Sequence, residues 1–195
     1  MRTAKINRKT KETEIEIELV LDGKGSGSVD TGVGFLDHML SLFANRGLFD
    51  LKVKAKGDLQ IDEHHTVEDV GIALGQAFSK ALGDKAGIRR YGFSLTPMDE
   101  VLATVAVDIS GRGMLTWNAE FKRERVGDLS TELLYDFFDA FARNCGTSLH
   151  MRLEYGRNEH HKAEALFKGF GMAMRTACEK DGQREGIPST KGVIG

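Results

Sequence analysis

The chain has 195 residues, of which 41% are hydrophobic and 29% charged, and a formal net charge of −2. These values are typical of globular proteins and exclude the strongly basic surface of most nucleic-acid-binding proteins. No apolar run approaches the roughly 20 residues of a membrane-spanning helix, so we expect neither nucleic acid nor a membrane as a partner. Two isolated cysteines, Cys145 and Cys178, and a polar N-terminal segment without a signal-peptide pattern favour a reducing, cytoplasmic location.

The first half of the chain carries the patterns of both strands and helices. Charged and apolar residues alternate from Thr13 to Gly25, as expected for a half-buried strand. Helical apolar spacing over Phe35–Gly47 stops at a glycine, as helices often do, and Leu48–Gly57 predicts the next strand. A second helix is predicted within Asp62–Phe78, which opens with DEHHTVEDV.

The second half repeats this order. Leu102–Trp117 predicts a strand, a Gly-Arg-Gly turn and another strand. Helical spacing returns over Leu133–Gly146, and Ser148–Gly156 predicts a further strand. Asn158–Met174 opens with NEHHKAEAL, so the EHHxxE pattern of the first half recurs in register. Each half therefore predicts the order strand, strand, helix, strand, helix.

These patterns indicate an α+β fold that is a tandem repeat of two similar halves. We expect the first half to span 1–84, the second half 85–182 and a glycine-rich C-terminal tail 183–195. Because no linker between predicted elements is long, we expect the halves to pack together as one unit.

Each HHxxE segment stands at the predicted start of a helix. Residues three and four apart share a helix face, so Glu68 lies near both His64 and His65. Adjacent histidines point about 100° apart on a helix, so each pair suits two different ions better than one. A single histidine pair also occurs by chance, but the two copies use four of the six histidines. The repetition predicts two metal sites, each assembled from both copies.

The preceding helices add a third pair of candidates. His38 lies in the first predicted helix, and aligning the repeats places Asp136 at or within a residue of the equivalent position. Imidazole and carboxylate ligands without thiolate favour Mn, Fe or Zn. The candidate metal ligands are His38, His64, His65, Glu68, Asp136, His160, His161 and Glu164.

Basic residues suggest an anionic ligand. Lys168 lies one helical turn beyond the second motif, Arg112 lies in the Gly-Arg-Gly turn, and Ser189 and Lys191 lie in the tail. Arginine binds phosphate in a bidentate manner and lysine adds a point charge, although any one such residue is more often a solvated surface charge. The acidic segment Thr96–Glu100 is a candidate for a catalytic or supporting role, or simply for a turn.

A resemblance to the imidazoleglycerol-phosphate dehydratase family rests on four segments, in this order: GFLDHML, DEHHTVEDV, NEHHKAEALFKGF and PSTKG. It covers essentially the whole chain. The resemblance implies that each half is a four-stranded sheet with two helices packed on one face. It also implies two Mn²⁺ ions per active site, and trimers that assemble into a 24-subunit homo-oligomer with active sites at subunit interfaces.

The resemblance further implies roles for individual residues. Glu12 of the KET motif would reach the substrate in a neighbouring subunit. Proton transfer is assigned to Glu164 or Glu12, with Asp99 as a further candidate. The phosphate would be held by Arg90, Arg112, Lys168, Ser189 and Lys191. The candidate ligands above would bind the metals, but Asp136 stands where the family often has a histidine.

The implied reaction removes water from imidazole glycerol phosphate to give imidazole acetol phosphate, a step of histidine biosynthesis. The C–H bond to be broken has no neighbouring carbonyl, so we expect the imidazole ring to take up electrons through a metal-bound imidazolate and a diazafulvene-like intermediate. A carboxylate would remove the proton. Two alternatives stay open: a dinuclear metallohydrolase with the same ligands, and metals that only fasten subunits together.

Overall fold

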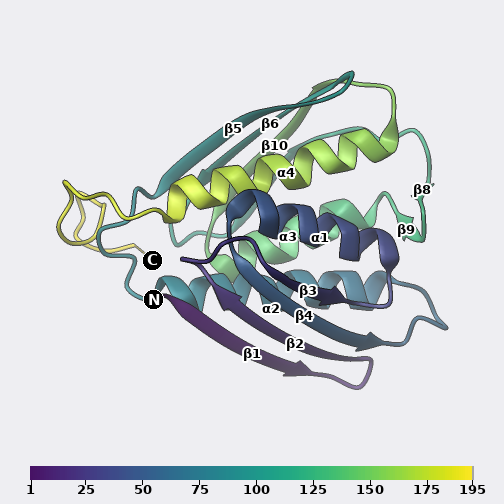
Figure 1. Cartoon of the computed structure of the whole chain (residues 1–195), viewed down its shortest axis with the longest axis horizontal. Coiled ribbons are helices and arrows are strands. Elements are labelled where there is room, and N and C mark those ends of the chain that lie inside the picture. Colours follow the sequence, from purple (N-terminus) through teal and green to yellow (C-terminus); the bar gives the residue numbers. More distant parts are fainter. Residues whose placement is uncertain (195) are drawn as a thin grey trace.

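Two four-stranded sheets enclose four helices in the computed structural model, which describes residues 1–194 (Figure 1). The strand order is β1-β2-β4-β3 in the first sheet and β5-β6-β10-β7 in the second. The elements of the first half are β1 Thr3–Lys9, β2 Thr13–Val20, β3 Gly27–Asp30, α1 Gly34–Gly47, β4 Asp50–Gly57 and α2 His64–Leu82. The elements of the second half are β5 Tyr91–Met98, β6 Val101–Asp108, β7 Met114–Asn118, β8 Arg125–Val126, β9 Leu129–Ser130, α3 Leu133–Cys145, β10 Ser148–Tyr155 and α4 Glu159–Cys178.

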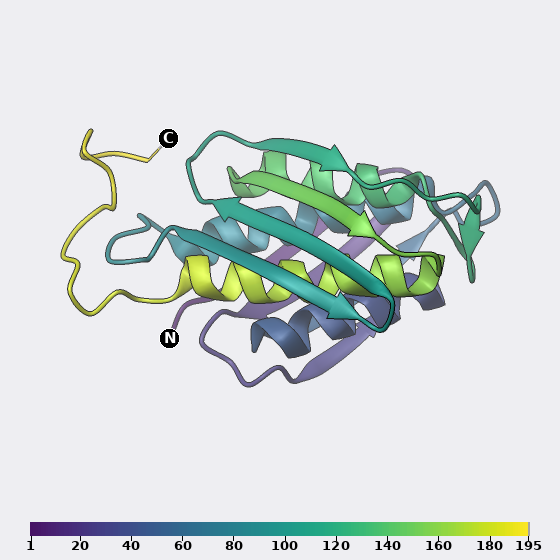
Figure 2. The same ribbon diagram turned by 90° about the horizontal axis from the view of Figure 1, so that it is seen from above.

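Both sheets have the same internal topology. β4 pairs antiparallel with β2 and parallel with β3, and β10 pairs antiparallel with β6 and parallel with β7. The helices lie on the inner face of each sheet, as the view turned by 90° also shows (Figure 2). The predicted tandem α+β fold, with a four-stranded sheet and two helices in each half, is therefore confirmed.

Alternation in the strands explains why each sheet has one buried face. In β2, Ile15, Ile17 and Leu19 are buried against the helices, while the glutamates between them are exposed. In β6, Val101 and Val105 are buried in the same way. Successive side chains of a strand point to opposite faces, so this pattern fixes which face receives the helices.

Each four-stranded sheet contains one strand more than the sequence pattern predicts, and the second half also contains the two-stranded β8–β9 sheet. β3 has four mostly exposed residues, so it lacks a recognisable alternation. β5 contains Pro97, which disfavours a strand in sequence terms. The second sheet tolerates this proline because β5 is an edge strand.

The helices of one half pack against those of the other, α1 on α4 and α2 on α3. Glycines make both crossings close. A Cβ atom at Gly171 of α4 would lie 2.5 Å from the carbonyl oxygen of Phe43, and one at Gly75 of α2 would lie 2.6 Å from that of Phe141. None of the four helices within residues 1–194 is long and apolar enough to cross a membrane.

We expect the Gly171→Ala substitution to lower the free energy of unfolding by about 1–3 kcal/mol, because the new methyl group must push α1 away. Chemical unfolding of the metal-free protein measures this change. Gly182→Ala is the matched control, since a Cβ atom there would have no neighbour within 4 Å. Equal stability of the two variants would contradict the close crossing.

Candidate functional site

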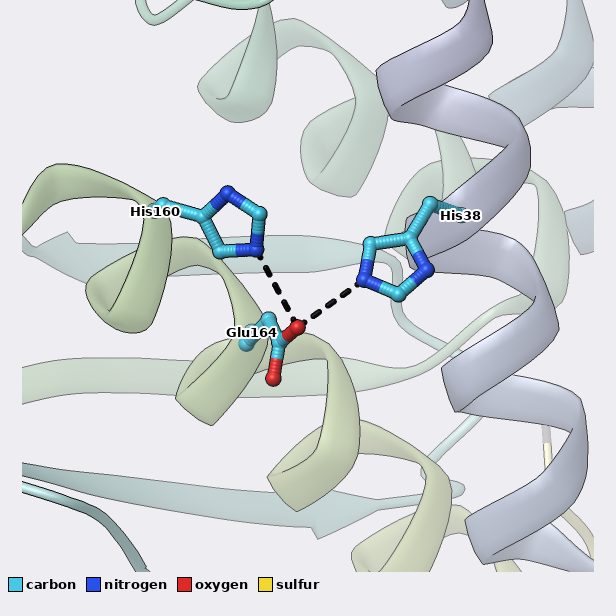
Figure 3. Close-up of side chains that lie close together, drawn as sticks. All are labelled: His38, His160 and Glu164. Atoms are coloured by element: carbon cyan, nitrogen blue, oxygen red, sulfur yellow. Dashed lines mark hydrogen bonds and ion pairs between the residues drawn. The ribbon is translucent and has the colours of Figure 1, made fainter.

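Three of the predicted ligands converge where α1 crosses α4 (Figure 3). The Glu164 carboxylate points between two imidazole rings, with Oε1 2.9 Å from His38 Nε2 and 3.2 Å from His160 Nε2. One ligand atom from each of the three residues lies within 4.8 Å of the others. The two rings are about half exposed, whereas the Glu164 side chain is only 9% exposed. The group is thus open to solvent on the histidine side.

Lys168 holds the other side of the Glu164 carboxylate. Its Nζ donates a hydrogen bond to Glu164 Oε2 from the next turn of α4. Burial opposes ionisation of Glu164, but hydrogen bonds from Lys168, His38 and His160 outweigh it and lower the pKa of this carboxyl to about 2. The Glu164 carboxylate is therefore negatively charged and held in place, which suits it to bind a cation. Both of its oxygens accept hydrogen bonds.

The first motif carries a looser counterpart of this group. His64 Nε2 lies 3.9 Å from Glu68 Oε2 at the start of α2.

The helix crossings show which residue of α3 corresponds to His38. Phe43 of α1 and Phe141 of α3 occupy equivalent places at the two crossings, so the two helices are related by an offset of 98 residues (141 − 43). The same offset relates His38 to Asp136 (136 − 38). Asp136 is half-buried in the first turn of α3. The fold thus removes the one-residue uncertainty in the repeat alignment.

The two histidine rings of each motif are nearly perpendicular and have different partners. The ring planes of His64 and His65 lie at 80°, and those of His160 and His161 at 87°. His65 Nδ1 bonds to Asp58 at 3.0 Å, and this hydrogen bond raises the pKa of His65. Within residues 1–194, the three-residue group on α1 and α4 contains no member of the first motif.

His161 is held in the same way as His65, but by a residue from a different segment. Its Nδ1 bonds to Glu100 Oε2 at 2.9 Å, and the hydrogen bond from His161 helps to lower the pKa of Glu100 to about 2. The opposite ring nitrogen, Nε2, lies 3.6 Å from Asp99 Oδ2. The acidic segment noted in the sequence therefore ends in a turn that contacts the second motif.

Glu12 lies in the corresponding turn of the first half, between β1 and β2. Its side chain is exposed and lines a cavity of about 330 Å³ together with Asp58. Its negative charge also contributes to the raised pKa of His65. Glu12 and Asp99 thus occupy comparable places, each near the second histidine of one motif.

Four of the five predicted phosphate-binding residues line one cavity of about 620 Å³, while the fifth, Lys168, lies beside Glu164 instead. These four are Arg90, Arg112, Ser189 and Lys191. The Arg90 guanidinium is oriented by Asp108, at 2.6 and 3.1 Å, and by the carbonyl oxygen of Pro188 at 2.9 Å. The cavity is suited to an anion because arginine, lysine and hydroxyl donors converge there.

The cavity and the Glu164 group lie at opposite ends of α4. The Arg90 N–H donates to the carbonyl oxygen of Ala177, near the C-terminal end of the helix, whereas Glu164 stands near its start. At a rise of 1.5 Å per residue, Glu164 and Ala177 are about 20 Å apart along the axis. A molecule that contacted both regions of one chain would have to span about this length.

The first glutamate of each EHHxxE motif anchors the segment 119–131, which contains the β8–β9 hairpin. Glu159 accepts hydrogen bonds from the Lys122 N–H at 3.0 Å and from Lys162 Nζ at 2.9 Å. Glu63 accepts from the N–H and the hydroxyl of Ser130 at 2.8 and 2.7 Å. Both glutamates are buried, so they hold this segment rather than an ion. The sequence signal that could have indicated this role is the recurrence of the same glutamate in both motifs.

Asp128, within the same segment, begins α1. Its carboxylate accepts hydrogen bonds from the N–H groups of Gly34 at 2.6 Å and Phe35 at 2.9 Å. The residue before the helix, Val33, has no side chain that could do this. One segment therefore fixes the starts of α1, α2 and α4, the helices that carry all of the predicted ligands except Asp136. No sequence pattern indicated Asp128.

The donor set fits a divalent metal of intermediate hardness. Imidazole nitrogens and carboxylate oxygens converge without thiolate, which suits Mn²⁺, Fe²⁺ or Zn²⁺. Together with a separate anion cavity, these groups define the class: an enzyme that acts on a small phosphorylated compound at histidine–carboxylate clusters.

Comparisons with known proteins identify the family within this class. Residues 31–174 match the family described as imidazoleglycerol-phosphate dehydratase. The enzyme of this name from Methanocella arvoryzae is 54% identical over 194 residues, which cover 100% of both chains. That from Acetivibrio thermocellus is 56% identical over 193 residues, with 99% of each chain covered. This chain belongs to the imidazoleglycerol-phosphate dehydratase family.

Solved structures agree with this assignment. The crystal structure of imidazoleglycerol-phosphate dehydratase from Staphylococcus aureus superposes with a TM-score of 0.83 at 39% identity, covering 92% of this chain and 99% of that one. The Pyrococcus furiosus structure, in complex with (S)-C348, gives a TM-score of 0.84 at 36% identity, covering 97% and 100%.

Proposed function

We propose that this chain eliminates water from imidazole glycerol phosphate to give imidazole acetol phosphate in histidine biosynthesis. The observation that carries the proposal is the full-length match to dehydratases, combined with histidine–carboxylate clusters and an anion cavity in one fold. The chain is accordingly a hydro-lyase. The dinuclear metallohydrolase alternative is not favoured, because the matched relatives are dehydratases.

The phosphate end of the substrate is assigned to the cavity at the end of α4. Arg112 and Lys191 supply positive charge there, and Ser189 supplies a hydroxyl donor. Arg90, held by Asp108, contributes a preoriented guanidinium. Lys168 is proposed to approach the substrate from its position beside Glu164. Charged donors in fixed positions favour binding of a phosphate over a neutral group.

The imidazole end is assigned to the histidine–carboxylate clusters, with two Mn²⁺ ions per active site as cofactors. The proposed ligands are His38, His64, His65, Glu68, Asp136, His160, His161 and Glu164. Bound Mn²⁺ would supply positive charge that stabilises electron density on the substrate ring. The convergence of His38, His160 and Glu164 supports this assignment for one ion.

Proton transfer is assigned to Glu12 in preference to Glu164. The base accepts the proton of the broken C–H bond, the neighbouring hydroxyl group leaves as water, and the resulting enol tautomerises to the ketone. Glu164 is a poor candidate because it is also a proposed metal ligand and accepts a hydrogen bond from Lys168, and both interactions weaken a carboxylate as a base. Glu12 is exposed, which supports the proposal that it acts on a molecule bound by a neighbouring chain. Asp99, 69% exposed at its turn, is the further candidate.

We propose that active sites form between subunits of a 24-subunit assembly built from trimers, in the cytoplasm. The ring of the substrate and its phosphorus atom are separated by only about five covalent bonds of roughly 1.5 Å each. This distance is far shorter than the length of α4 that separates the Glu164 group from the anion cavity. The outer face of β5 also favours self-association. Tyr91, Phe93 and Leu95 are 59%, 72% and 57% exposed there, and isolated chains rarely expose such apolar rows.

A turnover assay tests the proposal. The protein is stripped with a chelator, restored with Mn²⁺, Mg²⁺ or Zn²⁺, and followed for ketone formation from imidazole glycerol phosphate. We expect no turnover after stripping and recovery with Mn²⁺. Release of inorganic phosphate is measured in parallel, because a hydrolase would produce it. Metal-independent ketone formation would overturn the proposed cofactor, and phosphate release without ketone would overturn the reaction.

A further inference from the structure

Two carboxylates outside the ligand set hold the second histidine of each motif by the same ring atom. Asp58 accepts from His65 Nδ1 at 3.0 Å, and Glu100 accepts from His161 Nδ1 at 2.9 Å. A neutral imidazole has one N–H and one lone pair. With the hydrogen on Nδ1, the lone pair is on Nε2, which is then free to bind a metal.

Each carboxylate is itself held in place. Glu100 Oε1 accepts the Asn158 N–H at 2.8 Å, and Asn158 Oδ1 accepts the N–H groups of His160 and His161 at 2.9 and 3.3 Å. Rotating Glu100 would therefore disrupt the start of α4. Asp58 uses both oxygens on His65, at 3.0 and 3.2 Å, and its side chain is only 16% exposed.

The two arrangements do not descend from the sequence repeat. Asp58 follows β4, whereas Glu100 belongs to the turn between β5 and β6. β4 and β10 are related by an offset of 98 (148 − 50), which relates Asp58 to Gly156, a residue without a side chain. Glu154, a nearby carboxylate within β10, accepts from Thr104 and pairs with Arg152. Unrelated segments thus supply the same contact to both histidines, which points to a requirement of the site rather than to shared ancestry.

We propose that Asp58 and Glu100 are positioning residues that fix the tautomer and ring orientation of His65 and His161 for metal binding. The inference rests on the proposed metal role of these histidines. Each carboxylate therefore serves the metal site to which its own histidine contributes. Asp99, on the Nε2 side of His161, lies toward the ligand rather than behind it.

Mn²⁺ titration of the chelator-stripped, full-length chain tests this, with free Mn²⁺ measured by electron paramagnetic resonance. We expect Glu100→Leu to weaken one class of sites about 10–100-fold, the effect typical of lost carboxylate support behind a histidine ligand. Asp58→Leu should weaken the class of sites to which His65 contributes by a similar factor. Glu100→Gln and Asp58→Asn keep an oxygen acceptor and should lose less. At saturating Mn²⁺, kcat should recover in the single variants.

Glu154→Gln is the matched control and should bind Mn²⁺ as wild type does. The thermal midpoint of each stripped variant separates positioning from folding, because a positioning role changes Mn²⁺ affinity more than this midpoint. Wild-type affinity in both leucine variants, or weakening that only follows a lower midpoint, would overturn the inference. A wild-type chain that binds no Mn²⁺ would overturn the proposed metal role itself and this inference with it.

Discussion

Replacing Glu12 with glutamine is expected to lower turnover about 10²- to 10⁴-fold, the range typical of losing a general base, while Mn²⁺ binding stays unchanged. The side chain is exposed in the turn between β1 and β2, and within residues 1–194 it accepts no hydrogen bond. The substitution should therefore leave folding intact. Its charge nevertheless acts near His65, which places it beside a predicted ligand.

Single-turnover kinetics and Mn²⁺ content measure the two sides of this prediction. Glu16→Gln is the control, because Glu16 is an exposed glutamate on the outer face of β2, away from the turn. Unchanged turnover in Glu12→Gln would remove this residue from the mechanism and leave Asp99 as the candidate. Loss of Mn²⁺ together with turnover would instead make Glu12 a ligand.

Two inactive variants are expected to regain activity when they assemble together. His38→Ala removes a residue of the Glu164 group, and Arg112→Ala removes charge from the anion cavity. Each variant alone should lose nearly all turnover. If every active site draws these regions from different subunits, random mixing at equal amounts should restore about a quarter of the sites. The recovery is measured after co-expression or after disassembly and reassembly.

A second mixture is the control for this experiment. His38→Ala mixed with His160→Ala should stay inactive, because both residues belong to the same three-residue group of one chain. Recovery in this mixture as well would indicate that the group is completed across chains. No recovery in the first mixture would contradict the shared site and require one chain to reach both regions.

The doubled motif was sufficient to predict the positions of the two ligand-bearing helices. α2 begins at His64 and α4 at Glu159, where the pattern places them. The repeat also related His38 to Asp136 before the helix crossings made this relation definite. Periodicity and repetition are local properties of the chain, so sequence alone contains them.

The supporting contacts were largely beyond sequence analysis because they join distant segments. Glu100 and His161 are brought together by packing of the β5–β6 turn on α4, and Asp128 reaches α1 from a hairpin that has no counterpart in the first half. β3 was missed because four mostly exposed residues carry little pattern. The separation of the anion cavity from the Glu164 group likewise depends on tertiary structure.

The segment 119–131 makes the two repeats unequal partners. It belongs to the second half, yet it supplies the acceptor at the start of α1 and is bonded to Glu63 at the start of α2. Both helices of the first half thus depend on a segment that lies 94 and 67 residues further along the chain. A chain made of two copies of the first half would lack this segment. The N–H groups at the start of α1 and the Glu63 carboxylate would then lose these partners.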